Sequence, residues 1–331
     1  MQKILVIQTA FIGDAVLATG ILEKLHLTYP DAAIDFMVRK GNESLFINHP
    51  FLNNVIIWDK AKSKYKHLFE LLKQIRATKY DIVVNVQRFA ATGFLTAFSK
   101  AKTTIGFHKN PFSFLFTTKV KHIVSNAQNP LHEIERNQML IHSIASGEAM
   151  KPKLYPSNTD EQSISTYITE DFVCIAPASV WFTKQFPIHK WVQLINEITS
   201  TKVYLLGAKS DISMCNEIIE QSNHKNIESL ADKLSFLQSA AFMKQAKMNY
   251  VNDSAPMHFA SSVNAPTTAV YCSTLPSFGF GPLSSKRFIV ETPKALACRP
   301  CGLHGQKTCP LGHFNCANNI KVEQLTYTLI N

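Results

Sequence analysis

Short apolar runs alternate with amphipathic, helix-like stretches from the first residues of the chain onward. Strand-like runs occupy residues 3–8, 33–40, 54–59, 80–86 and 103–107. Helical periodicity follows at about 14–28, 65–77 and 131–146. Alternation of this kind is typical of a parallel sheet whose two faces are covered by helices.

The pattern is interrupted at residues 148–162, a segment with two prolines and no apolar periodicity, and then begins again. The second series of strand-like runs is 171–178, 202–208, 248–253 and 266–272, with a helix at 211–220. We therefore predict an α/β protein of two Rossmann-like, doubly wound domains, residues 1–155 and 156–331. Two such domains imply a cleft, with ligands at the carboxyl ends of the strands.

The first 20 residues are apolar enough to be compared with a signal peptide. However, Asp14 interrupts the run and Lys3 is its only basic residue. We expect the first strand and helix of a cytoplasmic protein. No stretch approaches the ~20 apolar residues that span a bilayer.

The net charge of +10 is concentrated in the first half of the chain. Residues 1–155 hold 20 lysines and arginines against 11 carboxylates, and residues 156–331 hold 14 against 13. A basic half indicates an anionic partner, with a solvated basic surface as the alternative. Because no motif of the usual nucleic-acid-binding families is present, we expect anionic lipid and no nucleic acid.

The segment Asn252–Ser262, NDSAPMHFASS, follows the strand-like run 248–251 directly. Asp253 or Ser254 suits the cap of the next helix, and Pro256 suits its first turn. The unpaired amides and positive dipole end of such a helix bind anions, and a diphosphate fits. An ordinary capped helix is the alternative.

The turn after the first strand contains no G-x-G-x-x-G, which argues against a dinucleotide fingerprint. It presents Asp14 directly after Gly13 at the start of a helix. This carboxylate either takes a proton from an attacking hydroxyl or only complements the helix dipole.

The loop after the strand at 171–178 carries Ser179, Thr183 and Lys184. A lysine beside hydroxyl groups at a strand's carboxyl end suits stabilisation of a leaving phosphate, and a solvated surface lysine is the alternative. We expect packing roles for the nearby aromatic residues, which are Trp181, Phe182, Phe186 and Trp191.

In order along the chain, five segments resemble glycosyltransferase family 9, the heptosyltransferase-like enzymes of bacterial lipopolysaccharide assembly. They are IGDAVLAT (12–19), HEIERN (132–137), the APAS…TKQFP…KW block from 176 to 191, LLGAKSD (205–211) and NDSAPMHFASSVNAP (252–266). The resemblance implies a GT-B architecture. It also implies that the acceptor binds mainly to the first domain and a nucleotide-sugar donor mainly to the second.

Residue by residue, the resemblance implies the following roles. Asp14 is the general base, Lys184 contacts the donor phosphates, Ser179 is a small hydroxyl residue, Asp253 contacts the donor sugar, Ser254 and Ala255 supply amides to the diphosphate, and His258 lies on the next turn. The chain departs from the family at Ala255, where glycine is usual, and at Pro177-Ala178-Ser179, where P-G-A-S is usual. The methyl group that alanine adds at such a position narrows a phosphate-binding loop. These departures therefore bear on which donor binds more than on the fold.

The implied reaction is inverting transfer of a sugar, heptose being favoured, from a nucleotide-diphosphate donor, with ADP-heptose favoured, to a lipopolysaccharide-type acceptor. Asp14 deprotonates the acceptor hydroxyl, and Lys184 with the helix start neutralises the leaving diphosphate. The chain has no D-x-D motif, so we expect no metal or other cofactor in catalysis. The alternatives are a nucleotide-sugar epimerase of the same architecture and an inactive glycolipid- or nucleotide-sugar-binding relative.

Seven cysteines divide into two groups. We expect Cys174, Cys215 and Cys272 to be small buried side chains. Cys298, Cys301, Cys309 and Cys316 lie together in a loop with prolines and glycines, and predict a structural zinc site with His304 and His313 as alternative ligands. Disulfides are the alternative, which a reducing cytoplasm disfavours.

Residues 100–121 interleave lysines with phenylalanines. This segment is either a basic-aromatic loop that enters a lipid interface or a strand pair with its phenylalanines in the core. The lysines at 60, 62, 64 and 66 favour a solvated helix entry. A membrane-embedded acceptor would place the protein on the inner face of the bacterial inner membrane.

Overall fold

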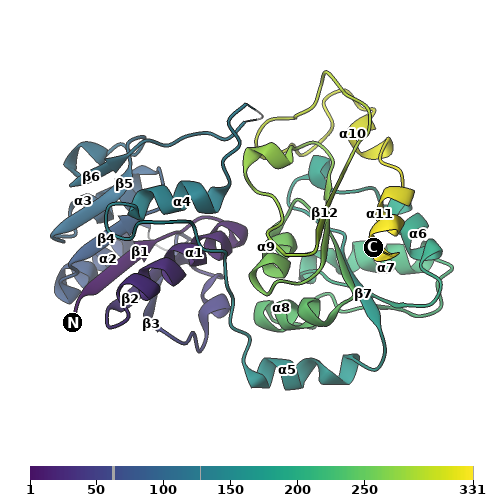
Figure 1. Ribbon diagram of the computed structural model, residues 1–331, viewed down its shortest axis with the longest axis horizontal. Coiled ribbons are helices and arrows are strands. Elements are labelled where there is room, and N and C mark those ends of the chain that lie inside the picture. The colour runs from purple at the N-terminus through teal and green to yellow at the C-terminus, as the bar shows by residue number, and fades with distance from the viewer. Residues whose placement is uncertain (62–63, 127, 331) are drawn as a thin grey trace. The chain divides into compact units, whose positions relative to one another are not determined.

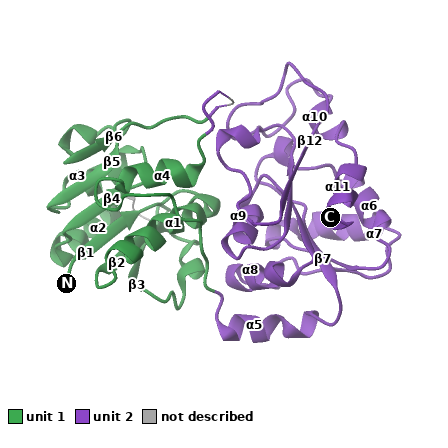
Figure 2. Cartoon of the chain, in the orientation of Figure 1, with its two compact units in different colours: residues 1–125, 131–155 green, residues 126–130, 156–331 purple. Residues whose placement is uncertain are grey.

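The computed structural model describes residues 1–61, 64–126 and 128–330. The chain forms two compact units, residues 1–125 with 131–155, and residues 126–130 with 156–331 (Figures 1 and 2). The first unit gives way to the second after Tyr155. Lys62, which belongs to the predicted helix entry, and residue 331 lie outside the described residues.

The first unit alternates strands and helices in the predicted order. Its elements are β1 (Lys3–Ile7), α1 (Ile12–Thr28), β2 (Ala33–Arg39), η1 (Glu43–Phe46), β3 (Leu52–Trp58), α2 (Lys64–Thr78), β4 (Ile82–Asn85), α3 (Ala90–Ala97), β5 (Thr103–Phe107), η2 (Ser113–Leu115), β6 (Thr118–Val120) and α4 (Glu133–Ile141). The six strands pair in parallel in the order β3-β2-β1-β4-β5-β6. Helices cover both faces, so β1 after Lys3 and β4 before Asn85 consist of buried Ile, Leu and Val.

The second unit repeats this plan. Its elements are α5 (Asn158–Ile164), η3 (Ser165–Tyr167), β7 (Phe172–Ala176), η4 (Phe182–Lys184), α6 (Ile188–Glu197), β8 (Lys202–Leu205), η5 (Lys209–Asp211), α7 (Ile212–Gln221), β9 (Ile227–Ser229), α8 (Phe236–Gln245), β10 (Met248–Asn252), α9 (Ala255–Ser262), β11 (Thr267–Tyr271), η6 (Pro276–Phe278), β12 (Arg287–Glu291), α10 (Asn315–Asn318) and α11 (Glu323–Ile330). The strand order is β12-β11-β10-β7-β8-β9, again parallel. Phe186 and Trp191 meet edge to face at 4.9 Å in its core, as packing residues do.

Each sheet has one point at which the strand order reverses. It lies between β1 and β4 in the first unit and between β7 and β10 in the second. Because crossovers on the two sides of this point leave in opposite directions, the loops at the strands' carboxyl ends separate and leave a crevice there. Asp14 follows β1, the Lys184 loop follows β7, and Asp253 follows β10, so the predicted site residues lie at these two points.

The structure corrects the sequence prediction in two places. Strands β9 and β12 were not predicted, and β6 only as part of the strand pair left open at 100–121, because all three lie at a sheet edge and lack a run of buried apolar residues. The helix predicted at 131–146 is the shorter α4, because His132 caps its start and the chain turns after Ile141.

Among the described residues, no helix combines the length and the apolarity that crossing a bilayer requires.

Candidate active site

Asn252 joins the two strands at the reversal point of the second unit. Its side chain is fully buried, its Nδ2 donates to the Pro177 carbonyl at 2.7 Å, and its Oδ1 accepts from the Phe186 amide at 2.9 Å. One amide group at the end of β10 thus holds both ends of the loop that follows β7. A buried amide group left without its hydrogen-bond partner costs ~1–3 kcal/mol. The two bonds of Asn252 therefore favour a single conformation of this loop.

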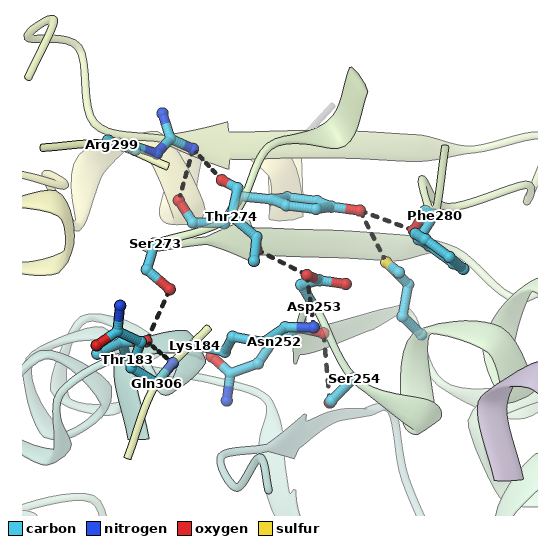
Figure 3. A network of polar contacts seen from close by, with 12 residues as sticks. Thr183, Lys184, Asn252, Asp253, Ser254, Ser273, Thr274, Phe280, Arg299 and Gln306 are labelled. Atoms are coloured by element: carbon cyan, nitrogen blue, oxygen red, sulfur yellow. Dashed lines mark hydrogen bonds and ion pairs between the residues drawn. The ribbon is translucent and has the colours of Figure 1, made fainter. Parts of the chain in front are cut away.

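Lys184 and Asp253 form an ion pair on that loop and strand end (Figure 3). The Lys184 Nζ lies 2.7 Å from Asp253 Oδ2, and the two side chains are only 15% and 9% exposed. The Thr274 hydroxyl donates to the same oxygen at 2.7 Å. The lysine is therefore not a freely solvated surface group, because it is held at the carboxyl ends of β7 and β10.

Helix α9 begins directly beside this pair. Ser254 occupies the N-cap position and Pro256 lies in the first turn, but no side chain among the described residues caps the helix. The predicted capping by Asp253 or Ser254 is therefore wrong: Asp253 pairs with Lys184, and the Ser254 hydroxyl donates to the Asn252 carbonyl at 3.4 Å. Pro256 carries no N–H and the Met257 amide donates to the Ser254 carbonyl at 3.1 Å, so the Ala255 amide is the donor that the first turn of α9 offers to an anion.

The other residues that were predicted to bind the donor differ in the solvent exposure of their side chains. Ser179 is half-buried, and its carbonyl accepts from Gln185 Nε2 at 2.6 Å. Thr183 is 1% exposed and its Oγ1 accepts from the Ser273 hydroxyl at 2.9 Å. His258 lies buried on α9, one turn after the partly exposed Ala255. The structure thus gives the Thr183 hydroxyl internal contacts, and its contact with the donor stays a prediction.

In the first unit, Asp14 lies in the first turn of α1, half-buried, after the N-cap residue Phe11. The preceding loop is tied to the end of β4, since Thr9 Oγ1 donates to Gln87 Oε1 at 2.9 Å. Gln87 in turn donates from Nε2 to Gln8 Oε1 at 2.8 Å. These buried side chains fix the backbone that leads into the Asp14 turn.

Arg136, from the HEIERN segment, lies within electrostatic range of Asp14. Burial and the charge of Arg88 lower the pKa of Arg136 to about 10, and Asp14 opposes this shift. The guanidinium pairs with Glu133 and donates from Nη1 to the Ile123 carbonyl at 3.2 Å. It remains charged at neutral pH and supplies positive potential near the Asp14 carboxylate.

A pocket of about 370 Å³ lies at the carboxyl ends of β2 and β3, lined by Arg39, Lys40, Trp58, Asp59, Lys60 and Ala61. Lys40 pairs with Asp59 at 2.8 Å, and the Arg39 guanidinium lies 5.4 Å from the Phe11 ring. Lys60 lies over the Trp58 ring at 4.9 Å and donates to the Thr9 carbonyl at 2.7 Å. Three cations against one carboxylate give the pocket a net positive charge beside the loop that leads into α1 and Asp14.

The cysteines fall into the two predicted groups. Cys174, Cys215 and Cys272 are buried, which confirms them as small core side chains. In the cysteine-rich segment, residues 298–316, burial and then the neighbouring Cys298 and Cys309 raise the pKa of Cys301. Cys301 thus lies within electrostatic range of two other thiols, yet no three His, Cys, Asp or Glu side chains of the described chain are arranged to hold a metal ion.

Residues 100–121 combine the two structures that the sequence left open. Phe107 on β5 and Phe116 are buried in the core, whereas Phe114 and Leu115 on η2 are 70% and 45% exposed. The strands of this segment, β5 and β6, pair in parallel and do not form a hairpin.

Sequence reasoning missed Asn252, Thr274 and Arg136, as well as the pocket at Arg39. One signal was available, because the buried strands β4 and β10 both end in asparagine, Asn85 and Asn252. A side-chain amide at the end of an apolar strand, next to the point where the strand order reverses, indicates that it holds a neighbouring loop by hydrogen bonds. The other contacts join residues far apart in the chain and carry no local signal.

Known proteins resemble this chain in sequence and in fold. The sequence model of glycosyltransferase family 9 (heptosyltransferase) matches residues 68–312. Lipopolysaccharide heptosyltransferase 3 of Escherichia coli is 25% identical over 281 residues, which are 80% of this chain and 82% of the relative.

Two solved structures share the fold over almost the whole chain. The ADP-heptose lps heptosyltransferase II of E. coli superposes with a TM-score of 0.78, at 21% identity and 99% coverage of both chains. A family 9 glycosyl transferase from Veillonella parvula gives a TM-score of 0.85 at 20% identity, covering 99% of this chain and 97% of that one. The predicted GT-B fold class, two doubly wound α/β units, is confirmed.

Proposed function

Because the chain belongs to glycosyltransferase family 9, the heptosyltransferase family, and is therefore a glycosyltransferase, we propose that it transfers a heptose from ADP-heptose to a lipopolysaccharide core-type acceptor with inversion. The observation that carries this proposal is the Lys184–Asp253 pair beside the uncapped start of α9. The relatives named as lipopolysaccharide heptosyltransferases support the donor and acceptor classes.

On the donor side, the leaving diphosphate lies against the Ser254 and Ala255 amides at the start of α9 and against the Lys184 ammonium. Negative charge grows on the diphosphate as the glycosidic bond breaks, and fixed positive groups stabilise it most when water is excluded. Asp253 holds the lysine in place and reaches the donor sugar through its remaining oxygen, Oδ1. Because Lys184 and the helix start provide this neutralisation, the proposed reaction uses no divalent metal.

On the acceptor side, Asp14 takes the proton of the attacking hydroxyl as the new bond forms on the opposite face of the anomeric carbon from the leaving group. The pocket lined by Arg39, Lys40 and Lys60 binds the acceptor, whose anionic groups match its positive charge. Arg136 places its positive charge within electrostatic range of the Asp14 carboxylate.

The proposal is tested with purified protein and a panel of ADP-, UDP-, GDP- and CMP-sugars. We expect ADP-heptose to raise the thermal unfolding temperature and to be consumed when a truncated lipopolysaccharide core is added, giving a product of inverted anomeric configuration. Stabilisation by another nucleotide sugar would correct the donor. Stabilisation without turnover on any acceptor would favour a non-catalytic binding protein.

We also propose a structural metal ion in the cysteine-rich segment, bound by Cys298, Cys301, Cys309 and Cys316. Its support is the mutual proximity of the thiols, whose side chains must turn toward one another to form a ligand shell. We expect stoichiometric zinc or iron in the purified protein, lost in Cys309→Ser and retained in Cys215→Ser, a buried cysteine elsewhere. Metal-free protein with titratable thiols would contradict the proposal.

We further propose that the first unit contacts an anionic membrane surface through an aromatic patch, which we define as Phe69, Phe94, Phe98, Phe112, Phe114 and Leu115. Phe94 joins α3 to α2 and to the η2 turn, with ring centroids 5.6 Å from Phe69 and 6.1 Å from Phe112. Arg76 donates to the Phe98 carbonyl at 2.7 Å, and lysines of the 100–121 segment are exposed. Aromatic and basic side chains together favour an anionic lipid interface.

Phe114→Asp with Leu115→Asp should reduce co-sedimentation with vesicles of phosphatidylglycerol and phosphatidylethanolamine at low salt. Exposed apolar area is replaced by charge of the same sign as the lipid. Leu27→Asp, at an exposed leucine on α1 outside the aromatic patch, is the control and should sediment like the wild type. Equal binding of all three proteins would exclude the patch.

A further inference from the structure

Residues 298–306, here called the bracing segment, hold the carboxyl end of β11 (Figure 3). Arg299 Nη2 donates to the carbonyls of Tyr271 at 3.2 Å and Thr274 at 2.7 Å. It also pairs with Glu291 at 2.7 Å, and its side chain is only 9% exposed. The Cys301 amide donates to the Ser273 carbonyl at 3.0 Å. The backbone of residues 273 and 274 is therefore fixed from outside the sheet.

The other end of the bracing segment contacts the Lys184 loop. The Thr183 amide donates to the Gln306 carbonyl at 3.1 Å, and the Gln306 amide donates to Thr183 Oγ1 at 2.8 Å. Gly305 lies so close that a Cβ on it would come within 2.9 Å of Lys184 Cγ and 3.0 Å of Thr183 Oγ1. A glycine is required for this approach.

We propose that the bracing segment positions the Lys184–Asp253 pair for the donor diphosphate, with Arg299 and Gln306 as positioning residues; this inference deepens the proposed function and rests on it. Arg299 fixes Thr274, whose hydroxyl donates to Asp253 Oδ2. Gln306 fixes Thr183, the residue before Lys184. Both partners of the ion pair are thereby held by one short stretch, more than a hundred residues after Lys184 in the chain.

The physical benefit is preorganisation. A lysine side chain has four rotatable bonds and loses ~2 kcal/mol of conformational freedom when it is fixed. The Lys184 stem lies against Gly305 and its ammonium pairs with Asp253, so this conformational freedom is lost when the protein folds. Less entropy is then lost when the phosphate binds, and the affinity for the phosphate is higher.

The test compares alanine at two glycines of the cysteine-rich segment. Gly305 and Gly312 have nearly the same left-handed φ, +77° and +72°, so alanine brings similar backbone strain to both. A Cβ on Gly312 would meet nothing within 4 Å, whereas a Cβ on Gly305 displaces Lys184. We expect Gly305→Ala to weaken ADP binding by calorimetry about tenfold or more, and Gly312→Ala to bind as the wild type does.

A second pair of variants examines the other end of the brace. Thr274→Val removes the hydroxyl that donates to Asp253 and keeps the shape of the side chain, and it should weaken ADP binding. Thr274→Ser restores the hydroxyl and should recover much of that loss. Thr292→Val, at a buried threonine whose hydroxyl donates to the Lys294 carbonyl at 3.4 Å and accepts from the Lys294 amide at 3.3 Å, is the matched control.

Two readouts keep this inference separate from the donor proposal. Amide hydrogen exchange at Thr183 should accelerate in Gly305→Ala and not in Gly312→Ala, with no ligand present. Failure of the wild type to bind ADP would count against the proposed donor. Equal ADP affinities and equal Thr183 exchange in the two glycine variants would overturn the bracing role, whatever the donor is.

Discussion

Asp14→Asn should lower the rate of sugar transfer by ~10²–10⁴-fold while ADP binding stays close to that of the wild type. Asparagine has the same shape as aspartate, so the first turn of α1 and its neighbour Arg136 keep their places. It has no basic oxygen to take the acceptor proton, so only the chemical step is affected. Single-turnover rates and calorimetric ADP binding measure the two effects separately.

The control is Asp31→Asn, at an exposed aspartate in the turn between α1 and β2. It changes the net charge equally and should leave transfer unaltered. A joint fall of ADP affinity, transfer rate and unfolding temperature in Asp14→Asn would mean that the carboxylate stabilises the helix start and does not act as the base.

Lys184→Met should lower the turnover number by ~10²–10³-fold, because the growing charge on the diphosphate loses its nearest fixed cation. ADP affinity should fall as well, by about tenfold or more, since a hydrogen bond to a charged group is lost. Methionine keeps the stem that packs on Gly305. Steady-state kinetics with donor and acceptor varied in turn would separate the two effects.

Removal of Lys184 also leaves Asp253 with the Thr274 hydroxyl as its remaining named partner, so the unfolding temperature is measured alongside. Lys244→Met, at an exposed lysine on α8, matches the change of charge on the same unit. If Lys184→Met and Lys244→Met showed the same turnover and ADP affinity, the ammonium would have no part in donor binding.

The sequence predicted most of the fold because the inner strands are buried on both faces. Runs such as those of β7 and β10 have a composition that few other structures permit. The edge region was harder: β9 is a three-residue strand of half-buried residues, and its pairing with β8 is decided by neighbours that are distant in sequence.

The candidate site divides in the same way. The start of α9 was predictable because aspartate and serine just before a helix and proline in its first turn are a local signal, although neither side chain caps the helix. The ion pair with Lys184 was not, because it joins residues of β10's end and the β7 loop, which only the sheet order brings together. Arg299 likewise binds carbonyl groups, which every residue possesses, so its role leaves no trace in residue types.

Asn252 fixes the beginning and end of the loop after β7, yet Val180 in the middle of that loop is 80% exposed. In this loop, the ends that Asn252 holds keep Lys184 in position, and the exposed middle is free to contact a ligand. Substitutions in the middle alter which surfaces the loop meets, while the cation for the diphosphate stays where it is. Redesign of sugar preference should therefore begin in the middle and leave the Asn252 contacts intact.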